Sequence, residues 1–133
     1  MKKKFAVVFL FFALVVGGYH IKKVLPLRNA TVLSAKSFTV YQSVSTNTKK
    51  TSDLIKYEAV EKQTALELLK KTAIIKTKGE AEDAFVISID DQAAQTENRE
   101  YWAFYVNGKA SKVGAGSYQL TPNDKIEWKI EKY

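Results

Sequence analysis

Tyr101-Trp-Ala-Phe-Tyr-Val-Asn-Gly108 is the stretch that decides the fold of this chain. Its first six residues are aromatic or β-prone, which predicts a strand. Asn107-Gly108 is the dipeptide that best fits a type I′ hairpin turn, because both central residues of that turn need a positive φ. Near the end of the chain, residues 125–131 alternate charged and apolar side chains, which predicts a second strand with one buried and one solvated face.

The remaining pattern predicts an α+β domain. Strands are expected at 37–44, 53–60 and 85–89, with a short one at 73–77 and a polar hairpin loop at 45–52. Thr64 and Glu67 form a capping-box pattern at the start of an amphipathic helix. A turn is expected at 121–124, where Pro takes the second position and Asn the third.

Alternation also predicts which side chains face the helix. In the strand at 85–89 we expect Phe85, Ile87 and Ile89 to point inward. The set expected to face the helix is Phe38, Val40, Phe85, Ile87, Trp102, Phe104, Val106, Ile126, Trp128 and Ile130. From it and the helix we take the structural core to include Leu66, Leu69, Trp102, Phe104 and Trp128.

The first 18 residues are typical of an export signal. Lys2–Lys4 precede an uncharged apolar run at 5–16, and small residues follow at 17–18. The run, even when extended to residue 21, is short for a bilayer span. Residues 1–18 are therefore a signal peptide or, if uncleaved, a membrane anchor through residues 5–21. Residues 19–31 form a connector, residues 32–133 the domain, and the location is extracellular or at the cell surface.

Composition limits the possible functions. The chain has 133 residues and a formal net charge of +7, of which Lys2–Lys4 supply three charges. The remaining basic residues form no cluster of the kind that nucleic acid requires, so no nucleic-acid partner is expected. There is no Cys and one His, at position 20, and no nucleophile–base pairing is apparent. We therefore expect no enzyme, no catalytic residue, no cofactor and no metal site.

Several segments occur in the order found in a known family: Thr64–Leu69, Ser88–Asp90, Tyr101–Lys109, Val113–Ala115, Tyr118 and Asp124–Trp128. This set resembles the bacterial extracellular domain grouped with the C-terminal β-domain of transcobalamin and intrinsic factor, over about residues 32–133. The resemblance implies a small β-grasp-like fold, a mostly antiparallel sheet with one helix packed on one face. Asn123 and Asp91 stand where the family often has Gly. The large helical domain that encloses cobalamin in transcobalamin is missing from this sequence.

The sequence predicts a non-enzymatic binding module. Alternation sends several tyrosines to the open face of the sheet, and Tyr joins a large apolar surface to a polar tip. The residues expected to contact a ligand are Tyr41, Tyr101, Tyr105, Asn107, Lys109 and Tyr118. The partner is a small molecule such as a cobalamin-like ligand, a glycan or a surface protein. The alternative is a structural or adhesion module that binds protein or wall polymer.

Overall fold

The computed structural model describes residues 34–46 and 53–133, which fall in one compact unit, Ser34–Tyr133. The predicted signal or anchor segment, the connector at 19–31 and most of the loop at 45–52 lie outside the described residues. In the part of the chain that is described, no helix is long and apolar enough to cross a membrane.

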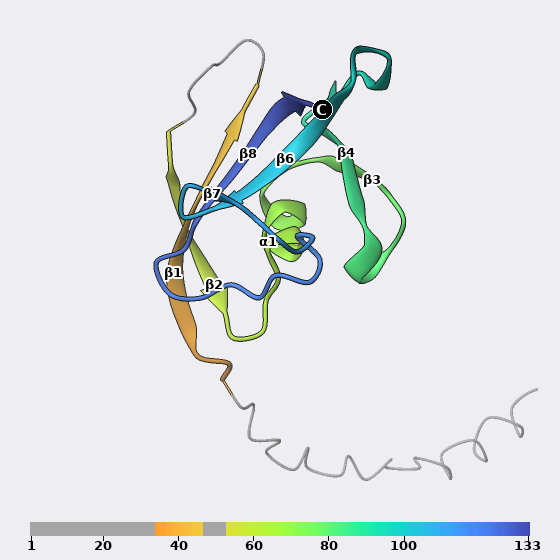
Figure 1. Cartoon of the computed structure of the whole chain (residues 1–133). Helices are drawn as coiled ribbons and strands as arrows, with labels where there is room; N and C mark the ends of the chain where they lie inside the picture. The colour runs from red at the N-terminus through yellow and green to blue at the C-terminus, as the bar shows by residue number, and fades with distance from the viewer. Residues whose placement is uncertain (1–33, 47–52) are drawn as a thin grey trace, which may run out of the picture. The chain divides into compact units, whose positions relative to one another are not determined.

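The strands form two sheets, where the sequence predicted one (Figure 1). The larger sheet has the order β2-β1-β8-β6-β7, and the smaller has the order β3-β4-β5. The strands are β1 (Ser37–Ser45), β2 (Ile55–Val60), β3 (Ile75–Lys78), β4 (Phe85–Ile89), β5 (Gln92–Ala93), β6 (Glu100–Val106), β7 (Lys109–Ala110) and β8 (Lys125–Lys132). Two single-turn 3-10 helices lie at Ala81–Asp83 and Thr96–Asn98.

The larger sheet is mixed. β1 and β8 run parallel, with Tyr41 opposite Lys125, whereas β1–β2, β8–β6 and β6–β7 are antiparallel. The prediction of a mostly antiparallel sheet is therefore correct for every pair but one. The strand pairing puts the first and last strands of the domain next to each other at its centre.

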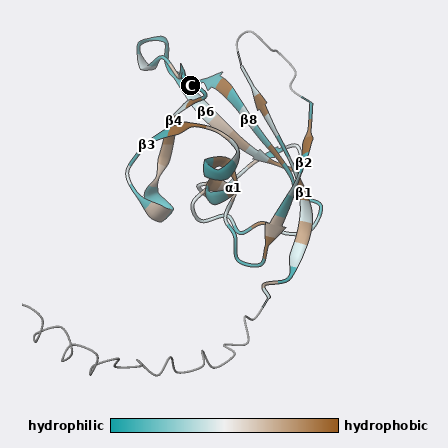
Figure 2. Cartoon of the chain, turned by 180° about the vertical axis from the view of Figure 1, so that it is seen from behind, coloured by the Kyte–Doolittle hydropathy of each residue, from teal (hydrophilic) through white to brown (hydrophobic). Residues whose placement is uncertain are grey.

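The single α-helix, α1 (Ala65–Thr72), packs on one face of the larger sheet, and β3 and β4 lie on its other side (Figures 1 and 2). The predicted capping box is present. The Thr64 hydroxyl accepts a hydrogen bond from the Glu67 amide at 3.2 Å, and the Glu67 carboxylate accepts one from the Thr64 amide at 2.8 Å. The amides of Ala65 and Leu66 donate to the carbonyls of Tyr118 and Ala115, so the following loop completes the helix start.

The core joins the helix to both sheets. Its buried members include Leu66, Leu69, Trp102 and Trp128, and Phe104 packs against them with part of its surface exposed. The predicted inward facing in β4 was wrong for Phe85 and Ile87 and correct for Ile89, which is fully buried. Phe85 and Ile87 are 51% and 39% exposed, while Val86, Ser88 and Ile89 are buried. The misassignment followed from treating Ser88 as an outward residue.

The predicted turns are confirmed. Asn107 and Gly108 have φ values of 51° and 79°, as a type I′ turn between β6 and β7 requires. Asn123 has a φ of 66°, and Asp91 a φ of 64°. These two residues adopt the left-handed conformation that a Gly would take at the same places.

Candidate functional site

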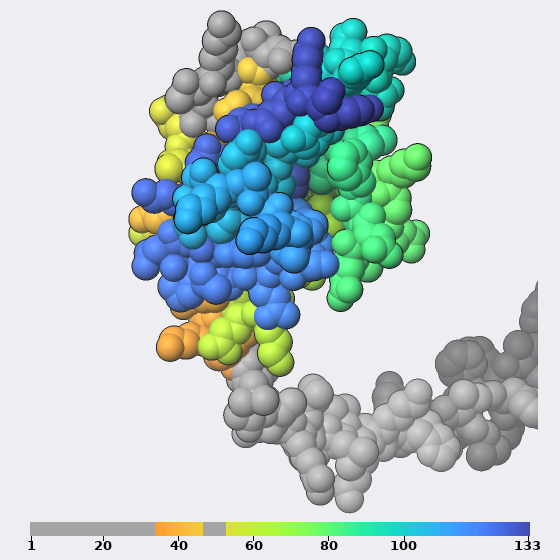
Figure 3. All heavy atoms as spheres, viewed as in Figure 1, coloured from red at the N-terminus to blue at the C-terminus, as the bar shows by residue number. Residues whose placement is uncertain are grey.

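A cleft of about 230 Å³ opens between β4 and β6, and we call it the β4–β6 cleft. Figure 3 shows it as a hollow between the green lobe that carries β3 and β4 and the blue segment that follows β7. The residues that line it are Ala84, Phe85, Val86, Tyr101, Trp102, Ala103, Phe104, Tyr105, Ala110, Ser111, Val113, Gly114, Ala115, Trp128 and Glu131.

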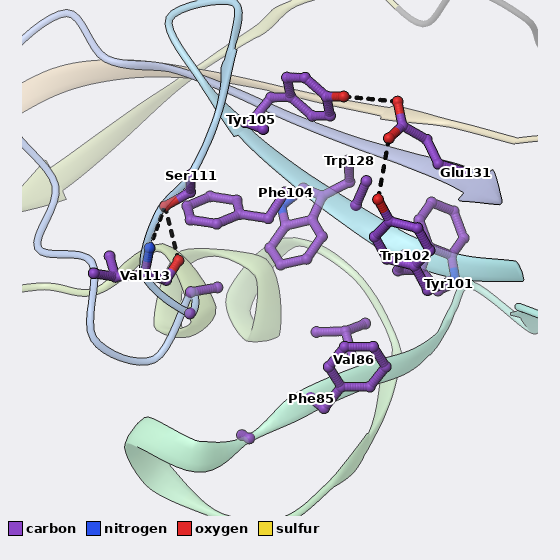
Figure 4. Close-up of a pocket in the computed structure, with 15 residues that line it drawn as sticks. Phe85, Val86, Tyr101, Trp102, Phe104, Tyr105, Ser111, Val113, Trp128 and Glu131 are labelled. Carbon is purple, nitrogen blue, oxygen red and sulfur yellow. Dashed lines mark hydrogen bonds between the residues drawn. The ribbon is translucent and has the colours of Figure 1, made fainter. Parts of the chain in front are cut away.

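Aromatic rings form much of the inner wall of this cleft. Phe104 and Trp128 stack with their ring centroids 5.1 Å apart, and Tyr118 meets the other side of Phe104 edge-on at 5.9 Å. Phe85 and Val86 approach the cleft from β4 (Figure 4). Phe85 and Val113, which is 50% exposed, present apolar side chains to solvent at the rim.

The two tryptophans of the cleft differ in their indole N–H groups. The Trp102 N–H donates to the carbonyl of Gln92 at 3.1 Å. The Trp128 indole nitrogen is buried and hydrogen bonds to no described residue, although Trp128 is only 2% exposed. A buried donor without an acceptor costs free energy, so this N–H is a place where a bound group with an acceptor atom would stabilise the domain.

A polar group lies on the outer side of β6 (Figure 4). The hydroxyls of Tyr105 and Tyr101 donate to the two oxygens of Glu131 at 2.8 and 3.3 Å, and Lys129 lies 3.4 Å from the same carboxylate. The Tyr105 hydrogen bond is the main cause that lowers the pKa of Glu131, and the same bond raises the pKa of Tyr105. Glu131 therefore stays ionised and fully engaged at neutral pH.

A second polar cluster lies beside Tyr118, at one end of the aromatic row Tyr118–Phe104–Trp128, and we call it the Asp124 corner. Asp124 is 3% exposed, and its carboxylate accepts from the Asn107 amide at 3.1 Å, the Tyr118 hydroxyl at 2.9 Å and the Thr121 amide at 2.8 Å. Burial is the main cause that raises the pKa of Tyr118, followed by its hydrogen bond to Asp124. The corner ties the β6–β7 hairpin to the turn before β8.

The predicted contact residues separate into three places. Tyr101 and Tyr105 line the β4–β6 cleft, whereas Asn107 and Tyr118 direct their polar atoms to the Asp124 corner. Tyr41 lies on β1 beside Lys125, outside the cleft lining, and Lys109 is exposed on β7. Their roles as ligand contacts remain predictions.

Sequence reasoning missed Phe85, Val113 and Glu131. Phe85 would have been found by placing Val86 inward, and Glu131 by noting that it shares an alternating face with Tyr101 across the β6–β8 ladder. Among the residues that the structure describes, no group of three or more His, Asp or Glu side chains is placed to hold a metal ion.

Fold and site together define a small two-sheet α+β domain with a cleft at the edge of its larger sheet. The chain belongs to the family described as a domain of unknown function, DUF4430, whose model matches residues 62–132. No protein with a curated description matches the chain.

Two solved structures share the fold. One is haptocorrin in complex with Cbi, with a TM-score of 0.66 and 19% identity over 74% of this chain. The match spans 26% of haptocorrin, so the chain corresponds to about a quarter of that protein. The other is a "putative metal binding protein" from Ruminococcus gnavus ATCC 29149, with a TM-score of 0.59 and 15% identity over 74% of this chain and 98% of that one. The predicted resemblance to the transcobalamin-type β-domain is thereby confirmed.

Proposed function

We propose that this chain is a non-enzymatic binding module whose ligand enters the β4–β6 cleft. The observation that carries the proposal is the Trp128 indole N–H, which is buried at the cleft and has no acceptor among the described residues. Buried donors in folded proteins nearly always have a partner. A ligand that brings an acceptor to this N–H while covering the exposed rings of the rim would supply the missing one.

The two hydrogen-bonded carboxylates, Asp124 and Glu131, support a binding role rather than a catalytic one. Asp124 is buried and accepts three hydrogen bonds within the domain. Glu131 is held by two tyrosines and Lys129, and its pKa is lowered, chiefly by Tyr105. A general acid at neutral pH needs a raised pKa, and a general base needs a free oxygen near its substrate. The lowered pKa of Glu131 does not suit the first role, and hydrogen bonds within the domain occupy the oxygens of both carboxylates.

A small molecule is the first candidate ligand. Haptocorrin, which shares this fold, was solved in complex with Cbi, and a cobalamin-like ligand is compatible with the aromatic rim of Phe85, Tyr101 and Tyr105. The cleft volume of about 230 Å³ is below the roughly 300–1,000 Å³ that drug-sized ligands fill. A large ring system would therefore rest across the mouth of the cleft and insert only one edge or substituent.

A surface adhesion module is the second candidate. The observation that favours it is the edge of β6, which β7 covers only at Tyr105 and Val106. Uncovered sheet edges bind extended segments of other proteins. Export through the apolar segment at 5–16 would put either kind of module outside the cell or at its surface, and the single helix packed on a mixed sheet supports a β-grasp-like assignment.

The proposal is tested by thermal shift on the full chain with cobalamins, wall glycans and oligosaccharides. A ligand that binds only the folded state stabilises it by about 1.4 kcal/mol at ten times its Kd. We expect Trp128→Phe, which removes the indole N–H and keeps a ring, to weaken binding about tenfold. Val113→Ala at the cleft rim should also weaken it, whereas Val60→Ala, at a site 36% exposed outside the cleft, should leave it unchanged. Equal effects of both valine variants would contradict the site.

A further inference from the structure

The edge of β6 that faces β4 carries main-chain groups that no strand uses. The Phe104 carbonyl accepts a hydrogen bond from the Ser111 amide at 3.0 Å, and the Glu100 amide donates one to the Gln95 carbonyl at 3.0 Å. The main-chain N–H and C=O groups of both residues therefore point away from β8. Residues two apart in a strand point the same way. Trp102 lies between them and turns its N–H and C=O to this edge as well, where no strand of the described chain pairs with it.

The strand across the cleft, β4, pairs with β3 on one side and with β5 on part of the other. β5 pairs with Ser88 and Ile89, and the Ile87 carbonyl accepts from Ala94 at 3.1 Å. The pairing of β4 with β3 shifts register between Lys76 and Thr77, and Phe85 lies opposite Lys78 beyond that shift, so its main chain belongs to the β3–β4 pair. The β4–β6 cleft thus lies between two strand edges that belong to different sheets and are not hydrogen bonded to each other.

Both sides of the gap are apolar. Toward the helix lie Val86, Phe104 and Trp128, and toward solvent lie Phe85 and Tyr101 (Figure 4). Among the lining residues only one side chain, Glu131, is charged; Lys129 forms an ion pair with it and two tyrosine hydroxyls donate hydrogen bonds to it. The occupant that matches these walls is uncharged and apolar on both faces.

We propose, building on the binding role above, that the ligand of the β4–β6 cleft is an extended, uncharged peptide segment that adds a strand to the edge of β6 that faces β4. Its main chain pairs with the N–H and C=O groups of Trp102, which no strand of the described chain pairs with. One of its side chains enters the cleft toward Phe104 and Trp128, and the next packs between Phe85 and Tyr101.

The small volume of the cleft favours a peptide over a compact ligand. About 230 Å³ is small for a drug-sized molecule but suits a side chain whose main chain runs along the gap. The hydrogen bond from the Trp102 indole to Gln92 links β6 to the start of β5. Strand addition gives affinity through the main chain and selectivity through the side chains that alternate between the two faces.

The test uses the full chain and a defined set of capped peptides, acetyl-Thr-X-X-X-Thr-amide, in which X is Val, Ile, Phe or Thr. Each peptide has a partner with the same side chains and N-methyl groups on alternate amides, which blocks hydrogen bonding along one edge. Binding is followed by NMR at the Trp128 indole N–H and the Trp102 main-chain N–H. We expect apolar members to move both signals and to protect the Trp102 amide from exchange. N-methylation on the edge that meets β6 should weaken binding at least tenfold.

The outcomes separate this inference from the proposed function. If N-methylated peptides bind as well as their partners, side chains alone hold the peptide and strand addition is wrong. If no peptide binds while a cobalamin or glycan moves the Trp128 indole signal, the cleft is a binding site and its ligand is not a strand. If neither peptides nor small molecules move that signal, both the inference and the cleft site fail.

Discussion

The Asp124 corner and the β4–β6 cleft lie at opposite ends of one aromatic row, Tyr118–Phe104–Trp128, yet they treat their buried polar groups in opposite ways. At the corner, a carboxylate that is 3% exposed accepts three hydrogen bonds from within the domain. At the cleft, an indole N–H of a residue that is 2% exposed has no acceptor in the described chain. The first arrangement is that of a structural joint, and the second is the one that we propose as a ligand site.

The largest loss of stability is expected when a ring of the aromatic row is removed. Trp128→Ala should destabilise the domain by about 3–5 kcal/mol, because truncating a buried Trp leaves a large cavity beside Phe104. Thermal or urea unfolding measures this loss. Trp128→Phe should cost much less, since it keeps a ring in the stack and removes a donor that no described residue uses. Unchanged stability in Trp128→Ala would show that Trp128 does not lie in the core.

The second-largest loss of stability is expected when the carboxylate of the Asp124 corner is removed. Asp124→Ala leaves the donors of Asn107, Tyr118 and Thr121 without their shared acceptor, and we expect a loss of about 3 kcal/mol. Asp124→Asn keeps the shape and one acceptor oxygen and should lose less. Chemical denaturation compares the two. If Asp124→Ala cost no more than a surface substitution, the corner would not be a structural joint.

The hairpin residue of the corner should show a smaller loss. Asn107 has a φ of 51°, and its side chain also accepts from the Lys125 amide at 2.9 Å. Asn107→Ala should destabilise the domain by about 2 kcal/mol, because Ala pays to hold a left-handed conformation and the side-chain hydrogen bonds vanish. Asn107→Gly keeps the conformation free of strain and isolates the hydrogen-bond part. An unaltered melting curve for Asn107→Ala would argue against the type I′ turn.

The smallest loss of stability is expected for the polar group on the outer side of β6. The pKa of Glu131 is lowered in the folded state, chiefly by Tyr105, so its contribution to stability is present above its ordinary pKa and is lost as pH falls through the folded value. The contribution should be at most about 1 kcal/mol, because solvent reaches this group. The difference in Tm between the wild type and Glu131→Gln should therefore shrink on going from pH 7 to pH 3. A difference that grows with acidity would reverse the sign.

Local features of the fold could be predicted from sequence because each depends on a few adjacent residues. Three short motifs set the local backbone conformation whatever the rest of the chain does: Asn107-Gly108, Thr64 with Glu67, and the turn that ends at Asp124. The facing of β4 could not be predicted as well. Phe85 and Ile87 are more hydrophobic than Ser88, yet Ser88 and its neighbour Ile89 are both buried, so burial does not alternate along the whole strand. The pairing of β4 with β3 also shifts register, which no pattern in the strand itself indicates.

The site was harder still to predict, because the cleft exists only where two strands, β4 and β6, lie near each other without being hydrogen bonded. β7 is two residues long and leaves Trp102 at an open edge, while β4 belongs to another sheet. No sequence pattern within either strand predicts the cleft between them. Sequence reasoning found Tyr101 and Tyr105 as side chains on a shared face, but Phe85 and Val113 come to the cleft only through the arrangement of the two sheets.

The most direct test follows the two indole N–H signals of the folded chain by NMR, since the chain has only two tryptophans. Trp102 donates to Gln92 and serves as the internal reference, whereas Trp128 has no acceptor in the described chain. We expect a ligand of the cleft to shift the Trp128 indole signal and slow its exchange with solvent, while the Trp102 indole signal changes little. A ligand that stabilises the domain but leaves the Trp128 signal in place would show that binding occurs elsewhere and would contradict the assignment of the β4–β6 cleft.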